Sequence, residues 1–278
     1  MAVTTKATGL GMHTEQLAGR TQQRFFRPEE QERFTYPQAF EVDFRKRAEF
    51  DAADMSASEA NLRLRELMSK GFGSIVMKNP GAKHGLAVGI LNRLNLTIDG
   101  SLGYFGCGLV DGPNIRVKGR VGWSCAENMM AGTVVIDKNA GSTFGAAMRG
   151  GDLVCKGDVG ARVGIDMKGG TIIIGGRAGA FCGFMMQRGR MVILGDAGKN
   201  LGDSMYDGTI YVGGKIAGLG VDAVPAEMTD LEAQWLERKL KMHGLAAPKG
   251  VKNLKKIAAG RQLWNYDNLE PAEKKLIL

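Results

Sequence analysis

A glycine recurs every nineteen residues through the middle of this chain. The repeated glycines are Gly103, Gly122, Gly141, Gly160, Gly179 and Gly198. Seven residues after the glycine, five consecutive periods carry a methionine, at Met129, Met148, Met167, Met186 and Met205. Common residues do not keep one register over so many periods by chance, so the sequence is built from one repeated structural unit.

Each period ends in a short β-rich run bounded by glycines, such as Thr133–Ile136 and Thr171–Ile174. A run of this length is too short for a helix, and β-branched residues favour strands. Stacked copies would pair about 4.8 Å apart. We therefore expect an all-β fold, a right-handed parallel β-solenoid of about seven coils of nineteen residues, with a degraded first coil from His84.

The repeat and its flanks divide the chain of 278 residues into four segments. These are an extended polar arm, an entry segment with a capping helix, the solenoid, and a C-terminal helix with a basic arm, at residues 1–40, 41–83, 84–222 and 223–278. A capping box at Ser56 starts the first helix, and Gly71 ends it. Thr229 starts the second helix, and Gly244 ends it. Extended arms therefore flank the fold at both termini.

Positive charge is concentrated near the C-terminus. The net charge is +8, and from Arg238 onward ten Lys or Arg residues face three Asp or Glu residues, a balance of +7. We expect this arm to lie on an acidic partner protein, with Leu263, Trp264 and Tyr266 as apolar contacts. Nucleic-acid binding is disfavoured, because no aromatic residues interleave the basic repeat faces.

The distribution of apolar residues along the chain indicates the cellular compartment. No run of about 18 apolar residues predicts a membrane span, and the N-terminus lacks the apolar core of a signal peptide. We therefore expect a cytoplasmic protein with reduced cysteines.

Residues that could carry chemistry are scattered among the coils. The cysteines are Cys107, Cys125, Cys155 and Cys182, and the histidines are His13, His84 and His243. Cys125 and Cys182 share a repeat position but lie three coils apart, about 14 Å, too far for a disulfide or a shared metal. The histidines lack ligand spacing. We expect no catalytic, cofactor-binding or metal residue on this chain.

Two further patterns have structural interpretations. The segment Gly218–Ala223 matches the glycine spacing of a dinucleotide fingerprint, but Pro225 interrupts and the expected helix begins only near Asp230. Eight residues after each repeat glycine stands a variable side chain, at Met130, Arg149, Lys168, Gln187 and Tyr206. We interpret this column as a solvated or partner-facing stripe.

The repeat resembles the family named for its Gly-Xaa-Gly-Xaa-Gly pattern. The residues that carry the resemblance are the coils from Gly141 to Gly214, with Asn139–Gly151 the most specific stretch. This family includes the C-terminal solenoid of the large glutamate synthase subunit, a formylmethanofuran dehydrogenase subunit and a related formyltransferase/hydrolase subunit. The stretch Gly202–Ala223 and the helix that follows it are similar to the stand-alone glutamate-synthase-type solenoid.

The resemblance implies a non-catalytic structural subunit of a glutamate-synthase-like flavoenzyme complex, making glutamate or, as in N-methylglutamate synthase, N-methylglutamate. It would form a hetero-oligomer, bridging a glutamine-amidotransferase-like subunit and an FMN-binding synthase subunit. FMN, with an iron–sulfur cluster or FAD, would lie on those partners. The alternatives are a subunit of a formyl-transferring complex in one-carbon metabolism and a free-standing structural or ligand-binding solenoid. The substrate is not identifiable from this chain.

Overall fold

The computed structural model describes residues 5–6, 13–17, 20–24 and 40–260, in two units divided at Ala39. In the N-terminal unit, three short strands form an antiparallel sheet: β1 (Thr5–Lys6), β2 (His13–Leu17) and β3 (Arg20–Arg24). The sequence predicts an extended polar arm over residues 1–40 and does not predict this strand pairing. These strands consist almost entirely of polar residues, so they lack the alternation of apolar and polar residues by which a strand is recognised in a sequence.

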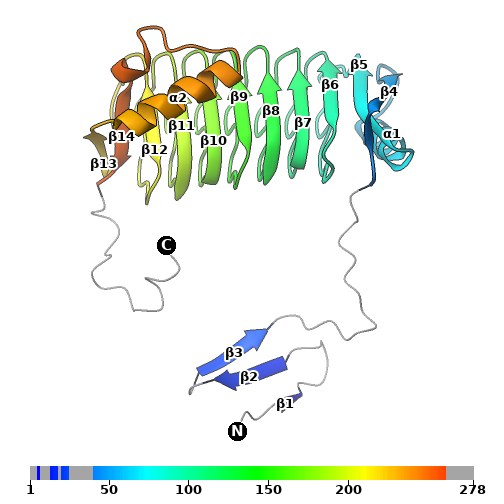
Figure 1. Ribbon diagram of the computed structural model, residues 1–278, viewed down its shortest axis with the longest axis horizontal. Coiled ribbons are helices and arrows are strands. Elements are labelled where there is room, and N and C mark those ends of the chain that lie inside the picture. Colours follow the sequence, from blue (N-terminus) through cyan, green and yellow to red (C-terminus); the bar gives the residue numbers. More distant parts are fainter. Residues whose placement is uncertain (1–4, 7–12, 18–19, 25–39, 261–278) are drawn as a thin grey trace. The chain divides into compact units, whose positions relative to one another are not determined.

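The second unit is a β-solenoid whose main wall is a sheet of eleven strands (Figure 1). The strands of this wall are β4 (Asp43–Asp51), β5 (Phe72–Lys78), β6 (Asn95–Asp99), β7 (Asp111–Val117), β8 (Ala131–Ile136), β9 (Asp152–Cys155), β10 (Lys168–Ile174), β11 (Arg188–Ile193), β12 (Thr209–Val212), β13 (Ala223–Ala226) and β14 (Lys255–Ala259). From β4 to β12 neighbours pair in parallel and in chain order. The expected parallel solenoid of about seven coils is confirmed.

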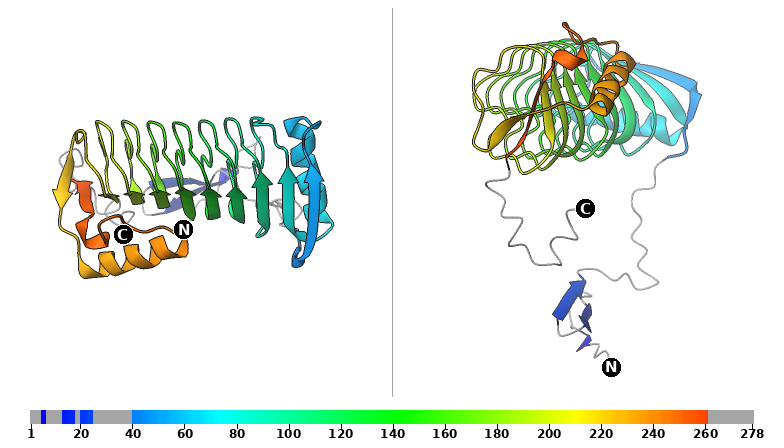
Figure 2. Two further views of the ribbon diagram at one scale, coloured as in Figure 1. Left: turned by 90° about the horizontal axis from the view of Figure 1, so that it is seen from above. Right: turned by 60° about the vertical axis from the view of Figure 1, so that its left-hand side comes forward.

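Two further ladders join the coils away from the main wall, in the part of each coil that Figure 2 draws as a loop. A column of isolated parallel bridges runs along Leu102, Val121, Ala140, Val159, Ala178, Ala197 and Ile216, all but the last directly before a repeat glycine. On the side rich in turns, backbone groups bond alternately to the next and the previous coil. For example, the amide of Thr143 donates to Ala161, whereas the amide of Gly145 donates to Cys125. Each coil is therefore held to its neighbours on every side.

Glycines serve two different purposes in this stack. At the first repeat position, a Cβ on Gly179 would lie only 2.7 Å from backbone atoms of the coil before it, so close approach excludes a side chain there. Four residues later the backbone is left-handed, with φ +62° at Gly164 and +71° at Gly183. Glycine adopts that conformation without strain. Close approach of the neighbouring backbone therefore selects glycine at Gly179, and positive φ selects it at Gly164 and Gly183.

The core lies inside the coils and consists of in-register apolar columns. All five repeat methionines are buried there. A second inward column runs from strand to strand, at Val117, Ile136, Cys155, Ile174, Ile193 and Val212. The methionine that recurs in the repeat therefore forms a ladder inside the stack.

The N-terminal end of the stack is closed by helix α1 (Ala57–Ser69), which begins with the expected Ser56 capping box. Its Asn61 replaces the hydrogen bonds that an earlier coil would supply. The Asn61 amide donates to the carbonyl of Gly85 at 2.7 Å and accepts from the amide of Ala87 at 2.8 Å. One side chain thereby completes the turn ladder of the first coil.

The C-terminal end is closed by residues that the sequence analysis assigned to the basic arm. After helix α2 (Asp230–Met242) and a short 3-10 turn η1 (Val251–Asn253), β14 pairs antiparallel with both β12 and β13. The arm assignment is wrong for residues 255–259, because the last parallel strand would otherwise leave an open edge that must be covered. Residues 261–278, including Leu263, Trp264 and Tyr266, lie outside the described residues.

Replacing Gly164 with Val should destabilise the stack. The new Cβ would lie 2.6 Å from the Met191 methyl group, at a φ that β-branched residues avoid. We expect a loss of about 1–3 kcal/mol from backbone strain alone, which lowers the melting temperature by several degrees. Gly218→Val is the control, since nothing lies within 4 Å of its Cβ position. Equal melting temperatures for the two variants would contradict this account.

Removing β14 should uncover the edge of β12. A chain that ends at Leu254 should melt at a lower temperature than one that ends at Gly260, and should aggregate as its concentration rises. Thermal melts followed by circular dichroism and light scattering compare the two truncations directly. If they behave alike, β14 does not protect the edge.

Candidate functional site

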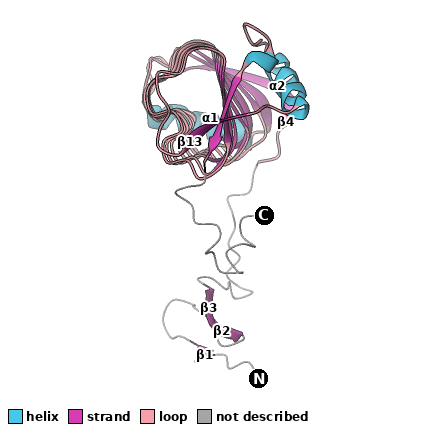
Figure 3. Cartoon of the chain, turned by 90° about the vertical axis from the view of Figure 1, so that its left-hand side faces the viewer, coloured by secondary structure: helices cyan, strands magenta, loops and turns pink. Residues whose placement is uncertain are grey.

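The outer face of the main sheet is divided into a covered and an uncovered half. Helix α2 lies on the outside of the coil, over the C-terminal strands (Figure 3). Beneath it, one outward register position in β9 to β12 is apolar and buried: Val154, Ile173, Val192 and Tyr211. In β6 to β8 the same position holds Thr97, Arg116 and Val135, none of them buried. The uncovered strands therefore present a mixed, largely polar face.

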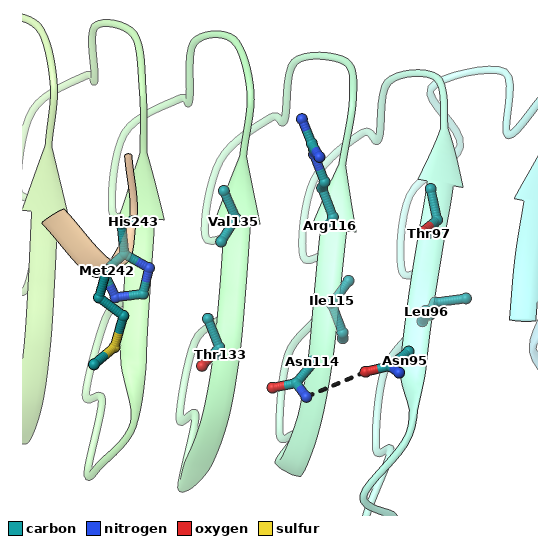
Figure 4. A pocket seen from close by; sticks show the side chains of 10 residues that line it. All are labelled: Asn95, Leu96, Thr97, Asn114, Ile115, Arg116, Thr133, Val135, Met242 and His243. Carbon is teal, nitrogen blue, oxygen red and sulfur yellow. Dashed lines mark hydrogen bonds between the residues drawn. The ribbon is translucent and has the colours of Figure 1, made fainter. Parts of the chain in front are cut away.

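A groove of about 400 Å³ lies on this uncovered face, at the end of α2 (Figure 4). Asn95, Asn114 and Thr133 line it from successive strands, and Met242 and His243 close one end. The amide of Asn114 donates to Asn95 at 3.2 Å. We call this hollow the α2 groove.

Three polar side chains fix the end of α2 beside the groove. Lys239 Nζ lies 2.7 Å and His243 Nε2 lies 3.2 Å from the same Asp152 oxygen. Burial raises the pKa of Asp152, but hydrogen bonds from His243 and Lys239 outweigh it and hold the pKa below its usual value. His243 and Asp152 are 91 residues apart, so no local spacing could have revealed their contact.

The other end of α2 is held by a carboxylate at its first turn. Glu232 accepts hydrogen bonds from the Tyr211 hydroxyl at 2.8 Å and from Lys256 at 3.0 Å. Burial opposes ionisation, but the hydrogen bond from Lys256 and those from Thr229 and Tyr211 lower the pKa of Glu232 to about 2. Burial and Glu232 raise the pKa of Tyr211. These groups fasten the helix to the sheet.

A second distinctive surface lies on the turn side of the first coils. The rings of His84 and Tyr104 stack with centroids 4.5 Å apart, and those of Tyr104 and Trp123 with centroids 5.2 Å apart. Phe105 and Leu109 are about half exposed nearby along the coil, and Trp123 is 57% exposed. We call these five residues the aromatic corner. Exposed apolar groups on adjacent coils are typical of an interaction surface.

The sequence-selected cysteines lie in the core. All four are buried thiols, and burial raises the pKa of Cys155 to about 11 and that of Cys182 to about 12. The pKa of Cys125 is raised mainly by a hydrogen bond with Cys107 and, to a smaller extent, by burial. These two thiols are therefore neighbours in adjacent coils. Thiols with raised pKa values are poor nucleophiles at neutral pH.

The remaining sequence-selected residues take varied positions. Of the variable column, Met130 and Arg149 are exposed, whereas Lys168 and Gln187 bond to Asp166 and are half-buried. The segment Gly218–Ala223 leads into β13, and the helix begins at Asp230 as expected. Within the described ranges, no group of His, Cys, Asp and Glu is suited to a metal ion. No helix among them is long and apolar enough to cross a membrane.

The family model described as GXGXG motif matches residues 56–246, from the start of α1 to just beyond α2. The chain belongs to the GXGXG motif family. This membership confirms the resemblance drawn from the repeat and supports a glutamate-synthase-like subunit.

A curated protein of similar sequence is Protein GlxC of Rhizobium meliloti (strain 1021). It is 43% identical over 63 residues, which cover 23% of this chain and 28% of that protein. Since the match covers under a third of either chain, it supports the relationship of this segment alone.

In this GXGXG protein, acid should loosen the start of α2. The pKa of Glu232 falls from 4.5 to about 2 on folding, so its stabilisation is complete above pH 4.5 and is lost as the pH falls towards 2. Trp235, stacked under Arg190 at 4.7 Å, reports this change by fluorescence when Trp123 and Trp264 are replaced by Phe. The same background with Glu232→Gln should lack the transition. An identical acid profile in both would exclude Glu232 as its cause.

Proposed function

We propose that this chain is a structural subunit that bridges a glutamine-amidotransferase-like subunit and an FMN-binding synthase subunit. The observation that carries the proposal is the aromatic corner, an exposed stack held in fixed register by a rigid solenoid. Aromatic side chains are enriched where proteins contact one another, and a large exposed apolar patch is uncommon on a monomer. A partner surface would cover Tyr104, Phe105 and Trp123.

Rigidity is the property that such a bridge would contribute. Every coil bonds to both neighbours, so a partner held at one coil keeps its distance from a partner held elsewhere on the stack. Fixed geometry would favour transfer of ammonia or methylamine between separate active sites. In this proposal FMN, with an iron–sulfur cluster or FAD, is held by the partners, and the product is glutamate or N-methylglutamate.

Reconstitution tests the proposal. The chain is co-expressed with the amidotransferase-like and FMN-binding subunits of its own organism, and the product is analysed by size exclusion with light scattering and visible absorbance. We expect one complex of three different chains that carries flavin, and no flavin on the isolated chain. Flavin bound stoichiometrically by the isolated chain would contradict the proposal, and a dinuclear metal hydrolase as the stable partner would favour the formyl-transferring alternative.

A point substitution then tests the aromatic corner itself. Trp123→Ala should weaken the complex by about 2 kcal/mol or more, as expected for an aromatic residue at the centre of an interface. Leu231→Ala is the matched control, because Leu231 is 77% exposed on α2, away from the aromatic corner. Equal affinities for the two variants would show that the aromatic corner is not the interface.

A further inference from the structure

We propose that the α2 groove is a second docking site, which accepts an extended, acidic segment of a partner protein. The inference rests on the proposed function, because a bridging subunit needs two separate contact surfaces. The aromatic corner lies on the turn side of the coil, whereas the α2 groove lies on the outer face of the main sheet. The two surfaces could therefore be occupied at the same time.

A buried imidazole aimed into the groove is the first observation. Only 6% of the His243 side chain is exposed, and Nε2 is held by Asp152, which Lys239 also neutralises. Figure 4 shows the opposite edge of the ring turned towards the strand that carries Thr133 and Val135. In a neutral imidazole whose Nε2 donates to the carboxylate, Nδ1 is an acceptor, and it lies on the ring edge that faces the groove. A backbone N–H of an extended segment is a suitable donor for it.

Charge complementarity is the second observation. Arg116 and Lys156 both lie 2.8 Å from the single carboxylate of Asp137, which leaves one excess positive charge beside the groove. The neighbouring acids do not cancel it, since Lys118 pairs with Asp99 and Lys239 pairs with Asp152. The side chain of Arg116 is 59% exposed. A carboxylate of the incoming segment is the natural partner for such a group.

The polarity of the groove indicates the form of the occupant. Helix α2 packs on this sheet against apolar side chains at one outward register position of β9 to β12. In the groove, the same register position of β6 to β8 holds Thr97, Arg116 and Val135. An amphipathic helix would lose its apolar contacts on such a face. The side chains of Asn95, Asn114 and Thr133 instead offer hydrogen-bonding groups on successive strands, which suits an extended backbone.

Site-specific photo-crosslinking in the reconstituted complex tests this inference. Asn114 is replaced with p-benzoylphenylalanine, the complex is irradiated, and the joined peptides are identified by mass spectrometry. We expect a peptide of a partner subunit with Asp or Glu close to the linked residue. The same replacement at Arg177, exposed on the other side of the coil, should not link that peptide.

Each other outcome overturns the inference. A linked peptide without acidic residues, equal linking from position 177, or linking to residues of this chain itself would show that the groove has another occupant. If the complex forms but position 114 links to nothing, the docking site is absent while the bridging function stands. If no complex forms, both proposals fail.

Affinity provides an independent readout. Arg116→Gln should raise the dissociation constant of the complex about tenfold, and less at high salt, because one charge-assisted contact is lost. Lys118→Gln is the matched control directly after the same strand, since Lys118 is 49% exposed and paired with Asp99. Both variants should have the same melting temperature as the parent protein. Equal dissociation constants for the two would overturn the role of Arg116.

Discussion

Backbone hydrogen bonding between residues one coil apart is the interaction on which the rest of this structure depends. In a stack, each coil must satisfy the amides and carbonyls of its neighbours on every side, because buried backbone groups without partners are costly. A uniform period of nineteen residues keeps those groups opposite one another. A single insertion would shift every side chain beyond it, so the period is fixed throughout the regular coils.

The glycines and the two closures follow from this requirement. Glycine stands where coils approach too closely for a Cβ, as at Gly179, and where the chain turns left-handed, as at Gly164. At the ends there is no further coil to bond. Asn61 supplies the missing groups at one end, and β14 reverses direction to cover the other.

The surfaces proposed for function arise where the repeat is broken rather than where it is kept. The exposed stack of His84, Tyr104 and Trp123 lies on the turn side of the first coils, and α2 covers only the C-terminal half of the outer sheet face. Both differences leave side chains exposed on a rigid support. A scaffold that holds two proteins at a fixed separation needs such local departures on an otherwise uniform stack.

The sequence by itself determined the solenoid, its period, the inward methionine column and both helices, because these depend on local periodicity and capping that recur in register. It did not reveal the contact of His243 with Asp152, the α2 groove, or the fold of residues 255–259 into the sheet. Those features join residues far apart in the chain. The local sequence of β14 resembles an ordinary basic segment and does not indicate that this strand pairs with β12 and β13. Only the tertiary structure decided them, because which face a helix covers and which edge a strand closes depend on the surface left open by the assembled coils.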